Sequence, residues 1–209
     1  MCGAMSAGKM ATVRAAKQAL RREIKVRVAA LSAEEKRRQA VLVSQELFRH
    51  PKYKSSQRVA VFLSMDDEVC TQDIIKDMFK WGKSCFIPRY ESCSSNMDML
   101  KLNSLQDIET LPLTSWNIRQ PAEDDNSREE ALTSGGLDLI LMPGLGFDRF
   151  GRRIGRGKGF YDTYLERCSR HPKGKPYTIA LAFKEQLCQE IPVDANDVLI
   201  DEVLYENHQ

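Results

Sequence analysis

Histidine and paired cysteine, two common sources of catalytic or metal-binding groups, are scarce in this sequence. Each of the three histidines lies beside a proline or near the C-terminus: His50, His171 and His208. We expect all three at the surface, which leaves little support for catalysis by histidine. The six cysteines are widely spaced and form no Cys-x-x-Cys pair, which disfavours a zinc site. A chain of 209 residues needs no disulfide scaffold, so free thiols in a reducing compartment are expected.

Long apolar segments and an excess of one charge are also lacking. The longest apolar stretch, residues 137–147, contains Asp138 and Pro143, whereas a membrane span needs about 20 apolar residues. No apolar run of the secretory type follows the first lysine. We therefore expect a cytoplasmic protein that makes no contact with a membrane. With 31 basic and 29 acidic residues the formal net charge is +2, which disfavours a histone-like binder of duplex nucleic acid.

The length indicates one domain, because domains contain about 150 residues. We expect a single α/β domain over residues 11–209, preceded by a disordered extension over residues 1–10. Apolar residues from Val13 to Leu31 recur at helical spacing. Ser32 and Glu35 form a capping box for a second helix, which is expected to stop before Pro51.

Short apolar runs alternate with helical segments along the rest of the chain. Thr71 is expected to cap a helix that ends at Gly82, and another helix is predicted over residues 160–169. Residues 103–134 are polar and irregular, and a short segment at 198–205 closes the chain. Strands are predicted at residues 58–64, 84–88, 97–102, 137–142 and 177–183, the second and third paired as a hairpin. This order predicts an open, mostly parallel sheet with helices on both faces, a three-layer α/β/α fold, with ligands beyond the carboxyl ends of the strands.

One loop concentrates the features of a phosphate site. Residues 144–159 contain six of the twelve glycines and five basic residues against one acid, Asp148. Glycine lets backbone N–H groups approach an anion, and arginine and lysine donate charged hydrogen bonds to phosphate. The spacing fits neither Gly-x-Gly-x-x-Gly nor a Walker A loop. A flexible basic surface loop and an Arg/Gly segment that binds nucleic acid are the alternatives, although the aromatic residues of a stacking platform are missing.

The end of this loop, Gly155-Arg-Gly-Lys-Gly-Phe-Tyr-Asp162, resembles the signature of the 5-formyltetrahydrofolate cyclo-ligase family. The resemblance covers nearly the whole chain from Lys17 onward. Phe160 replaces a tyrosine of many relatives, and Cys70 replaces an acid. The other segments that carry the resemblance are residues 17–21, 62–68, 115–121 and 142–147.

The resemblance implies an ATP- and Mg²⁺-dependent ligase of one-carbon metabolism. Such enzymes close 5-formyltetrahydrofolate to 5,10-methenyltetrahydrofolate, with release of ADP and phosphate, through a phosphorylated formyl group (an imidate phosphate). The expected partners are the folate and ATP, with no nucleic acid and no membrane, and we expect a monomer. The alternative function is that of a non-catalytic relative that binds a nucleotide or RNA through the basic loop.

The resemblance also implies roles for residues of this sequence. Arg156 and Lys158 are the predicted catalytic groups, and Asp162 and Asp197 the predicted Mg²⁺ carboxylates. Sequence logic alone leaves Asp162 as a helix-start acid, and Asp194 or Asp201 fit as well as Asp197. Lys17 and Arg21 share one helical face, which alone would suit a solvated basic surface. The implied ATP contacts are Lys17, Arg21, Arg153, Ile154, Gly155, Arg156, Gly157, Lys158, Gly159 and Tyr161. The implied folate contacts are Arg21, Leu63, Glu68, Trp116, Arg156, Phe160 and Tyr161.

Overall fold

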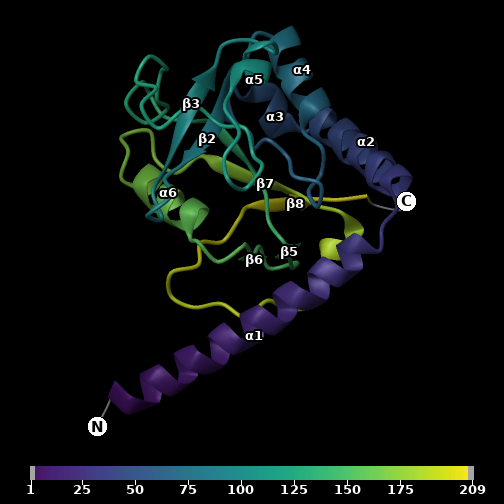
Figure 1. Cartoon of the computed structure of the whole chain (residues 1–209), viewed down its shortest axis with the longest axis vertical. Helices are drawn as coiled ribbons and strands as arrows, with labels where there is room; N and C mark the ends of the chain where they lie inside the picture. The colour runs from purple at the N-terminus through teal and green to yellow at the C-terminus, as the bar shows by residue number, and fades with distance from the viewer. Residues whose placement is uncertain (1–2, 207–209) are drawn as a thin grey trace.

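Six strands form one sheet, in which every neighbouring pair is parallel except β2 and β3. The computed structural model describes residues 3–206 (Figure 1). The antiparallel pairing of β2 with β3 confirms the predicted hairpin. In spatial order the strands are β3 (Met97–Leu102), β2 (Ser84–Tyr90), β1 (Arg58–Ala60), β4 (Leu139–Met142), β7 (Tyr177–Leu181) and β8 (Glu202–Leu204).

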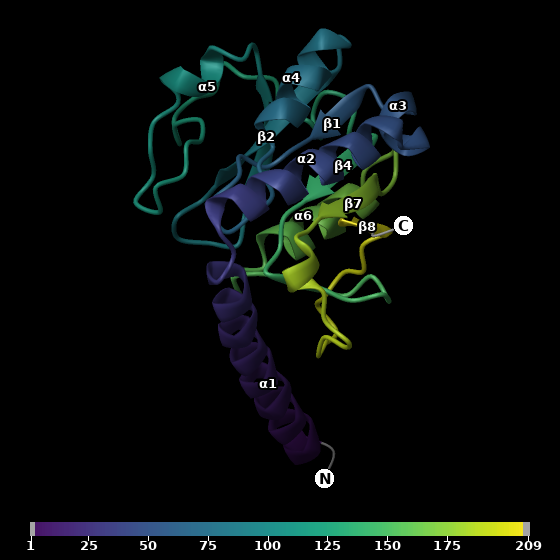
Figure 2. The ribbon, with the colours of Figure 1, turned by 90° about the vertical axis from the view of Figure 1, so that its right-hand side faces the viewer.

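Helices cover both faces of this sheet, so the predicted three-layer α/β fold is confirmed. Successive residues of a strand point to opposite faces, and Leu139 and Ile140 accordingly enter two different apolar clusters. The first cluster packs under α2 (Ala33–Arg49), α3 (Pro51–Ser55) and α4 (Gln72–Lys80). The second packs under α6 (Phe160–Ser169), on the other side of the sheet (Figure 2).

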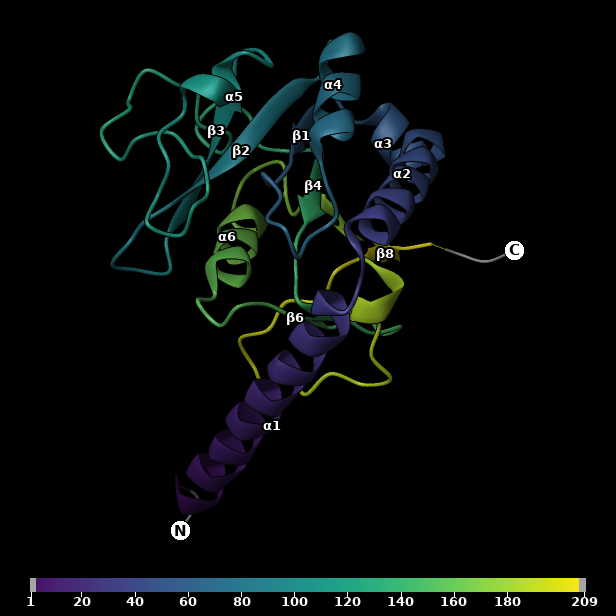
Figure 3. The same cartoon turned by 45° about the vertical axis from the view of Figure 1, so that its right-hand side comes forward.

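Helix α1 (Gly3–Ala29) extends away from the sheet and reaches it only with its C-terminal half (Figure 3). There Ile24 and Val28 are buried in the first apolar cluster. The helix runs across the predicted boundary at residue 11 without a break. Residues 1–2 of the predicted extension, including Cys2, lie outside the described residues, as does His208. The division into an extension and a domain stays a prediction.

Several local expectations are corrected. Ser32 caps α2 as predicted, by accepting from the Glu35 N–H at 3.1 Å, but the Thr71 hydroxyl makes no cap bond and donates to the Phe62 carbonyl at 2.7 Å. His50 is not a free surface residue, because its Nδ1 accepts from the Lys52 N–H and its Nε2 contacts Glu202 at 2.9 Å. The irregular region contains α5 (Asp107–Thr110), and a 3₁₀ turn, η1 (Lys184–Gln186), follows β7.

The described cysteines are all free, as expected: Cys70, Cys85, Cys93, Cys168 and Cys188. Within residues 3–206, no helix combines the length and the apolar character that crossing a membrane requires.

Candidate functional site

The predicted site residues gather where the parallel strands end. Three loops meet there: residues 61–71 after β1, residues 143–159 after β4 and residues 182–201 after β7. Helix α1 crosses the same region (Figure 1). Ligands of open α/β sheets bind at this edge, so the topology brings together the segments that the sequence singled out.

The glycine-rich loop folds back on itself as a small antiparallel hairpin, which was not predicted from the sequence. Strand β5 (Gly146–Phe147) pairs with β6 (Arg153–Ile154). Asp148 is 2% exposed and accepts hydrogen bonds from the N–H groups of Phe150 and Arg152 at the turn. From the sequence, Asp148 was noted only as the single acidic residue of the basic loop, and this structural role was not predicted. Strands of two residues carry too little periodicity to be found from the sequence.

Arg153 lies at the centre of the basic part of the site. Its side chain is 7% exposed, one terminal nitrogen contacts Asp162 at 3.1 Å, and the guanidinium lies over the Tyr161 ring at 5.5 Å. The Nε of Arg153 is buried and has no hydrogen-bond partner among residues 3–206. A Cβ on Gly155 would approach Nη1 of Arg153 to 2.7 Å, so glycine is required there for the arginine to keep its place.

Two basic residues of α1 reach this site. The Lys17 ammonium contacts Asp194 at 2.7 Å and Asp197 at 2.5 Å, and its side chain is 10% exposed. Burial lowers the pKa of Lys17, but the hydrogen bonds to the two carboxylates outweigh it and hold the pKa above its ordinary value. Arg21 donates from Nε to the Gly155 carbonyl at 2.8 Å. These contacts across the chain exclude a purely solvated basic face for both side chains.

The two predicted metal carboxylates are linked through Val198, which follows Asp197 and whose N–H contacts Asp162, but they differ in their remaining hydrogen-bonding capacity. Both oxygens of Asp162 are used, one by Arg153 and the other by the Val198 N–H at 3.1 Å. Asp197 accepts with Oδ2 from Lys17 and from the Asp194 N–H, while its Oδ1 accepts from no group in the described range. Residues 3–206 hold no cluster of three or more potential metal ligands. Because Mg²⁺ usually takes one or two protein carboxylates plus phosphate and water oxygens, Asp197 fits this role with its free oxygen better than Asp162.

A second carboxylate pair, in the loop after β1, faces the basic glycine-rich segment at residues 144–159 (the cradle). Arg156 contacts Asp67 at 2.5 Å and Glu68 at 3.4 Å. The Glu68 side chain is 10% exposed and accepts from the Met65 N–H at 3.0 Å. Burial raises the pKa of Glu68 above its ordinary value, although that N–H and Arg156 oppose the shift. Glu68 is therefore no member of a freely solvated turn. The sequence did not single out Asp67.

Aromatic side chains line the neighbouring part of the site. The Tyr90 and Phe160 rings lie 4.9 Å apart, and Trp116 lies 6.4 Å from Phe160. The Tyr90 and Tyr161 hydroxyls are 3.4 Å apart, and both rings are near enough to Glu68 for its charge to raise their pKa values, after the larger effect of burial.

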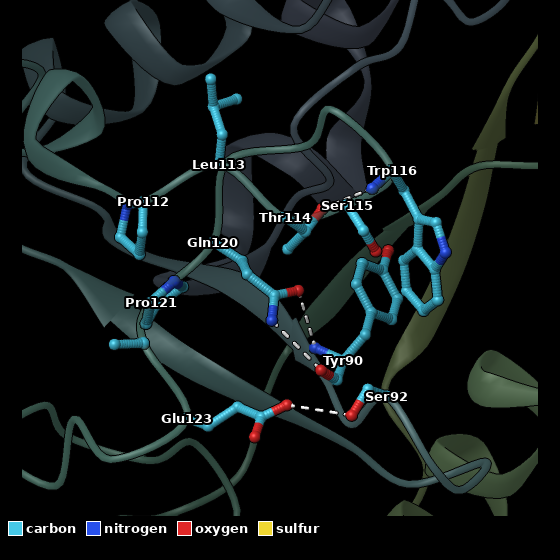
Figure 4. Close-up of a pocket in the computed structure, with 11 residues that line it drawn as sticks. Tyr90, Ser92, Pro112, Leu113, Thr114, Ser115, Trp116, Gln120, Pro121 and Glu123 are labelled. Atoms are coloured by element: carbon cyan, nitrogen blue, oxygen red, sulfur yellow. Dashed lines mark hydrogen bonds between the residues drawn. The ribbon is translucent and has the colours of Figure 1, made fainter.

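A cavity of about 240 Å³ opens beside Tyr90 and Trp116 (Figure 4). Gln120 holds its wall in place, since its side-chain amide donates to the Tyr90 carbonyl and accepts from the Tyr90 N–H, both at 3.1 Å. Neither Tyr90 nor Gln120 was predicted from the sequence. Their only signals are a tyrosine at the end of a strand and a glutamine beside Pro121, and neither is specific.

The remaining predicted residues differ in their exposure. Gly157, Lys158 and Gly159 are exposed at the start of α6, both glycines have positive φ, and Lys158 has no ion pair or hydrogen bond within the described part of the chain. Leu63 is half-buried against the first apolar cluster, and the Ile154 side chain is buried in that cluster.

The sequence is similar to known proteins over nearly its whole length. The family model described as "5-formyltetrahydrofolate cyclo-ligase family" matches residues 13–206. A mouse protein named 5-formyltetrahydrofolate cyclo-ligase is 60% identical over 94% of this chain and 96% of its own length. The Escherichia coli K12 protein of the same name is 30% identical over 87% of this chain and 95% of its own.

Solved structures also resemble the chain. The NMR structure of Aquifex aeolicus 5,10-methenyltetrahydrofolate synthetase has a TM-score of 0.71 at 27% identity, with 90% of this chain and 88% of that one covered. The Mycoplasma pneumoniae 5,10-methenyltetrahydrofolate synthetase has a TM-score of 0.69 at 21% identity and covers 91% of this chain and 99% of its own. The latter likeness concerns the fold alone.

Proposed function

Since the chain belongs to the 5-formyltetrahydrofolate cyclo-ligase family, we propose that its site closes 5-formyltetrahydrofolate to 5,10-methenyltetrahydrofolate at the expense of ATP and with Mg²⁺ bound. The cytoplasm and a monomeric state belong to the same proposal, as does the absence of a nucleic-acid partner.

The reaction needs an activated formyl group. The formamide oxygen attacks the γ-phosphorus of ATP, and ADP leaves with the electrons of the broken P–O bond. N10 of the folate then attacks the carbon of the resulting imidate phosphate and loses its proton. The C–O bond breaks, phosphate leaves, and a methenyl group bridges N5 and N10. Such chemistry asks for positioning and charge neutralisation rather than for a protein acid or base.

The unpartnered Nε of the buried Arg153 is the observation that carries the nucleotide assignment. Leaving a buried donor of a charged group without an acceptor costs free energy, and an anion at this point would remove that cost. Arginine presents parallel N–H donors that match phosphate oxygens. Lys17 and Arg21 approach from α1, so the polyphosphate would lie between the hairpin and that helix.

The basic residues at the start of α6 are assigned to the transferred phosphoryl group. Lys158 is exposed between two glycines and has no partner in the described chain, so its ammonium is free to contact a phosphate. Arg156 is held by Asp67 and Glu68, so binding a phosphate through Arg156 would exchange one set of oxygen acceptors for another.

Asp197 supplies the free carboxylate oxygen for Mg²⁺, and Asp162 is the second candidate carboxylate. The ion would neutralise charge on the phosphates when bound. Asp162 meanwhile orients Arg153 through the contact at 3.1 Å.

The aromatic side of the site suits the folate. The amino and amide N–H groups of a pterin ring are donors, and the buried Glu68 carboxylate is an acceptor close to the Tyr90 and Tyr161 rings. Phe160 and Trp116 offer flat apolar surface for the ring system.

Absorbance of the methenyl product tests the proposal directly. The protein is mixed with Mg-ATP and 5-formyltetrahydrofolate, and the methenyl chromophore should develop only when both substrates are present. Nucleotide binding without any chromophore would favour the non-catalytic alternative and would overturn the proposed reaction.

A further inference from the structure

The β5–β6 hairpin holds both ends of the loop that carries the acidic residues of the site. At the near end, the Cys188 N–H donates to the Phe147 carbonyl at 2.8 Å, and the Ile191 N–H donates to Oδ2 of Asp148 at 3.0 Å. At the far end, the Ile200 N–H donates to the Gly151 carbonyl at 2.8 Å. The loop at residues 192–199 is therefore hydrogen-bonded to the same hairpin at both of its ends.

Asp148 is the side chain on which this arrangement depends. Its carboxylate is fully buried and accepts three backbone N–H groups, two within the hairpin turn and one from Ile191. The nearest cation is Arg152, whose guanidinium lies 3.9 Å away and also contacts Glu190 at 2.8 Å. The carboxylate thus shapes the turn with one oxygen and attaches a distant segment with the other.

Both halves of the nucleotide site are connected to this carboxylate. On one side, Asp148 accepts a hydrogen bond from the Arg152 N–H, and Arg153 is the next residue in the chain. On the other side, the loop at residues 192–199 carries Asp194 and Asp197, which hold Lys17, and it carries Val198, whose N–H contacts Asp162. A change at Asp148 would move the acidic loop relative to the arginine of the cradle.

We infer that Asp148 is a positioning residue for the nucleotide half of the site: it fixes the loop at residues 192–199 against the hairpin that presents Arg153. The inference rests on the proposed function for the identity of the ligand. Asp148 is buried in the turn of the hairpin, so we assign it no direct contact with either substrate. Misplacement of binding groups by about 1 Å is enough to weaken a preorganised site.

Two substitutions release the loop without removing every acceptor. In Asp148→Asn, the side-chain oxygen can still accept from the N–H groups of the turn. The side-chain NH₂ then faces the Ile191 N–H, and because both groups are donors, the hydrogen bond to Ile191 is lost. Asp148→Ser keeps a shorter acceptor for the turn and does not reach Ile191. Should one variant fold poorly, the other still tests the inference.

Asp138 provides a matched control at the opposite end of the sheet. Its carboxylate also joins two segments, because it accepts from the Gln57 and Arg58 N–H groups at 2.9 and 2.8 Å. Asp138→Asn should lower the melting temperature without a change in ligand affinity.

Hydrogen exchange and calorimetric titration with ADP or 5-formyltetrahydrofolate give the readouts. In both Asp148 variants, the Asp194 and Val198 amides, which are hydrogen-bonded within the site, should exchange about tenfold faster. The Kd for ADP should rise about tenfold while the Kd for the folate stays within about threefold.

Unchanged exchange and ADP affinity would overturn the inference. So would equal weakening of both ligands, or the same result from Asp138→Asn, because each indicates general destabilisation. Exchange needs no ligand, so it tests the attachment even if the wild-type protein fails to bind ADP, a result that would instead overturn the proposed function.

Discussion

The two ends of the parallel strands differ in how completely some of their charged side chains are hydrogen-bonded. At the amino end, the buried Lys83 ammonium donates to three backbone carbonyls, those of Tyr53, Lys54 and Ser56. At the carboxyl end, Lys158 is exposed and has no partner within the described residues. The lysine at the amino end is thus fully hydrogen-bonded by backbone carbonyls, whereas Lys158 at the carboxyl end remains available to a ligand.

Carboxylates and arginines at the two ends show the same difference in hydrogen bonding. Asp138 at the amino end accepts two backbone N–H groups with Oδ2 and contacts Lys173 with Oδ1 at 2.6 Å, whereas Oδ1 of Asp197 accepts nothing from residues 3–206. Arg58 donates from all three of its nitrogens, whereas Arg153 leaves Nε unused. At the carboxyl end this unmet hydrogen-bonding capacity lies next to the proposed ligand, where it is available for binding.

The largest expected effect comes from removing the free lysine. Lys158→Ala should lower kcat about 10²-fold, or about 3 kcal/mol, because one charge that contacts the transferred phosphate is lost. The unfolding free energy should stay within about 0.5 kcal/mol of the wild type, since exposed side chains without partners contribute little. Absorbance of the methenyl product and urea unfolding measure the two quantities.

Lys25→Ala is the control for this variant, because Lys25 is exposed on α1 and has no ion pair in the described structure. It should leave both quantities unchanged. Near-normal turnover of Lys158→Ala would place the catalytic charge elsewhere, with Arg156 the next residue to test.

The reverse result is expected at the other end. Lys83→Met should lower the unfolding free energy by about 2 kcal/mol, because three carbonyls lose a charged donor. The kcat per folded molecule should not change, because Lys83 precedes β2 at the edge away from the site. Urea unfolding with Lys80→Met, an exposed neighbour, as control measures the loss. If Lys83→Met lowered kcat but not the unfolding free energy, the proposed difference between a stabilising amino end and a catalytic carboxyl end would be wrong.

The helices and the hairpin, which depend on residues close together in the sequence, were the part of the fold that could be predicted. Helix α2 begins after its predicted cap, α6 has its predicted bounds, and β2 and β3 pair as expected, because periodicity and capping act over neighbouring residues. Strand ends were less accurate: β1 is described only over Arg58–Ala60, although the Val61 N–H still donates to the Phe86 carbonyl.

The connections within the site could not be predicted in the same way. Lys17 and Asp197 are 180 positions apart, and Arg156 and Glu68 are 88 apart. Motifs identified most of the participants, but which oxygen remains free, or that Asp148 binds Ile191, depends on tertiary geometry. A single sequence has no local signal for either.

The smallest expected effect concerns Glu68, where the site carries a cost in stability. Burial raises the pKa of its carboxyl above the ordinary value of 4.5. A carboxyl whose pKa is higher in the folded state stabilises that state only while it is protonated, so its contribution is lost as the pH rises. Glu68→Gln should therefore leave the unfolding free energy at pH 7 unchanged or higher, and should raise the Kd for the folate about tenfold, or about 1.4 kcal/mol, because half of the acceptor becomes a donor.

The pH dependence separates this explanation from a simple loss of shape. Wild-type affinity for the folate should fall as the pH drops through the raised pKa, since protonation removes the acceptor, whereas the glutamine variant should show no such fall over the same range. Calorimetric titration at a series of pH values from pH 7 downward measures both curves. Asp67→Asn is the control, because Asp67 contacts the same Arg156 without the burial of Glu68. If Asp67→Asn weakened the folate as much as Glu68→Gln, Arg156 rather than Glu68 would be the group that recognises the pterin ring.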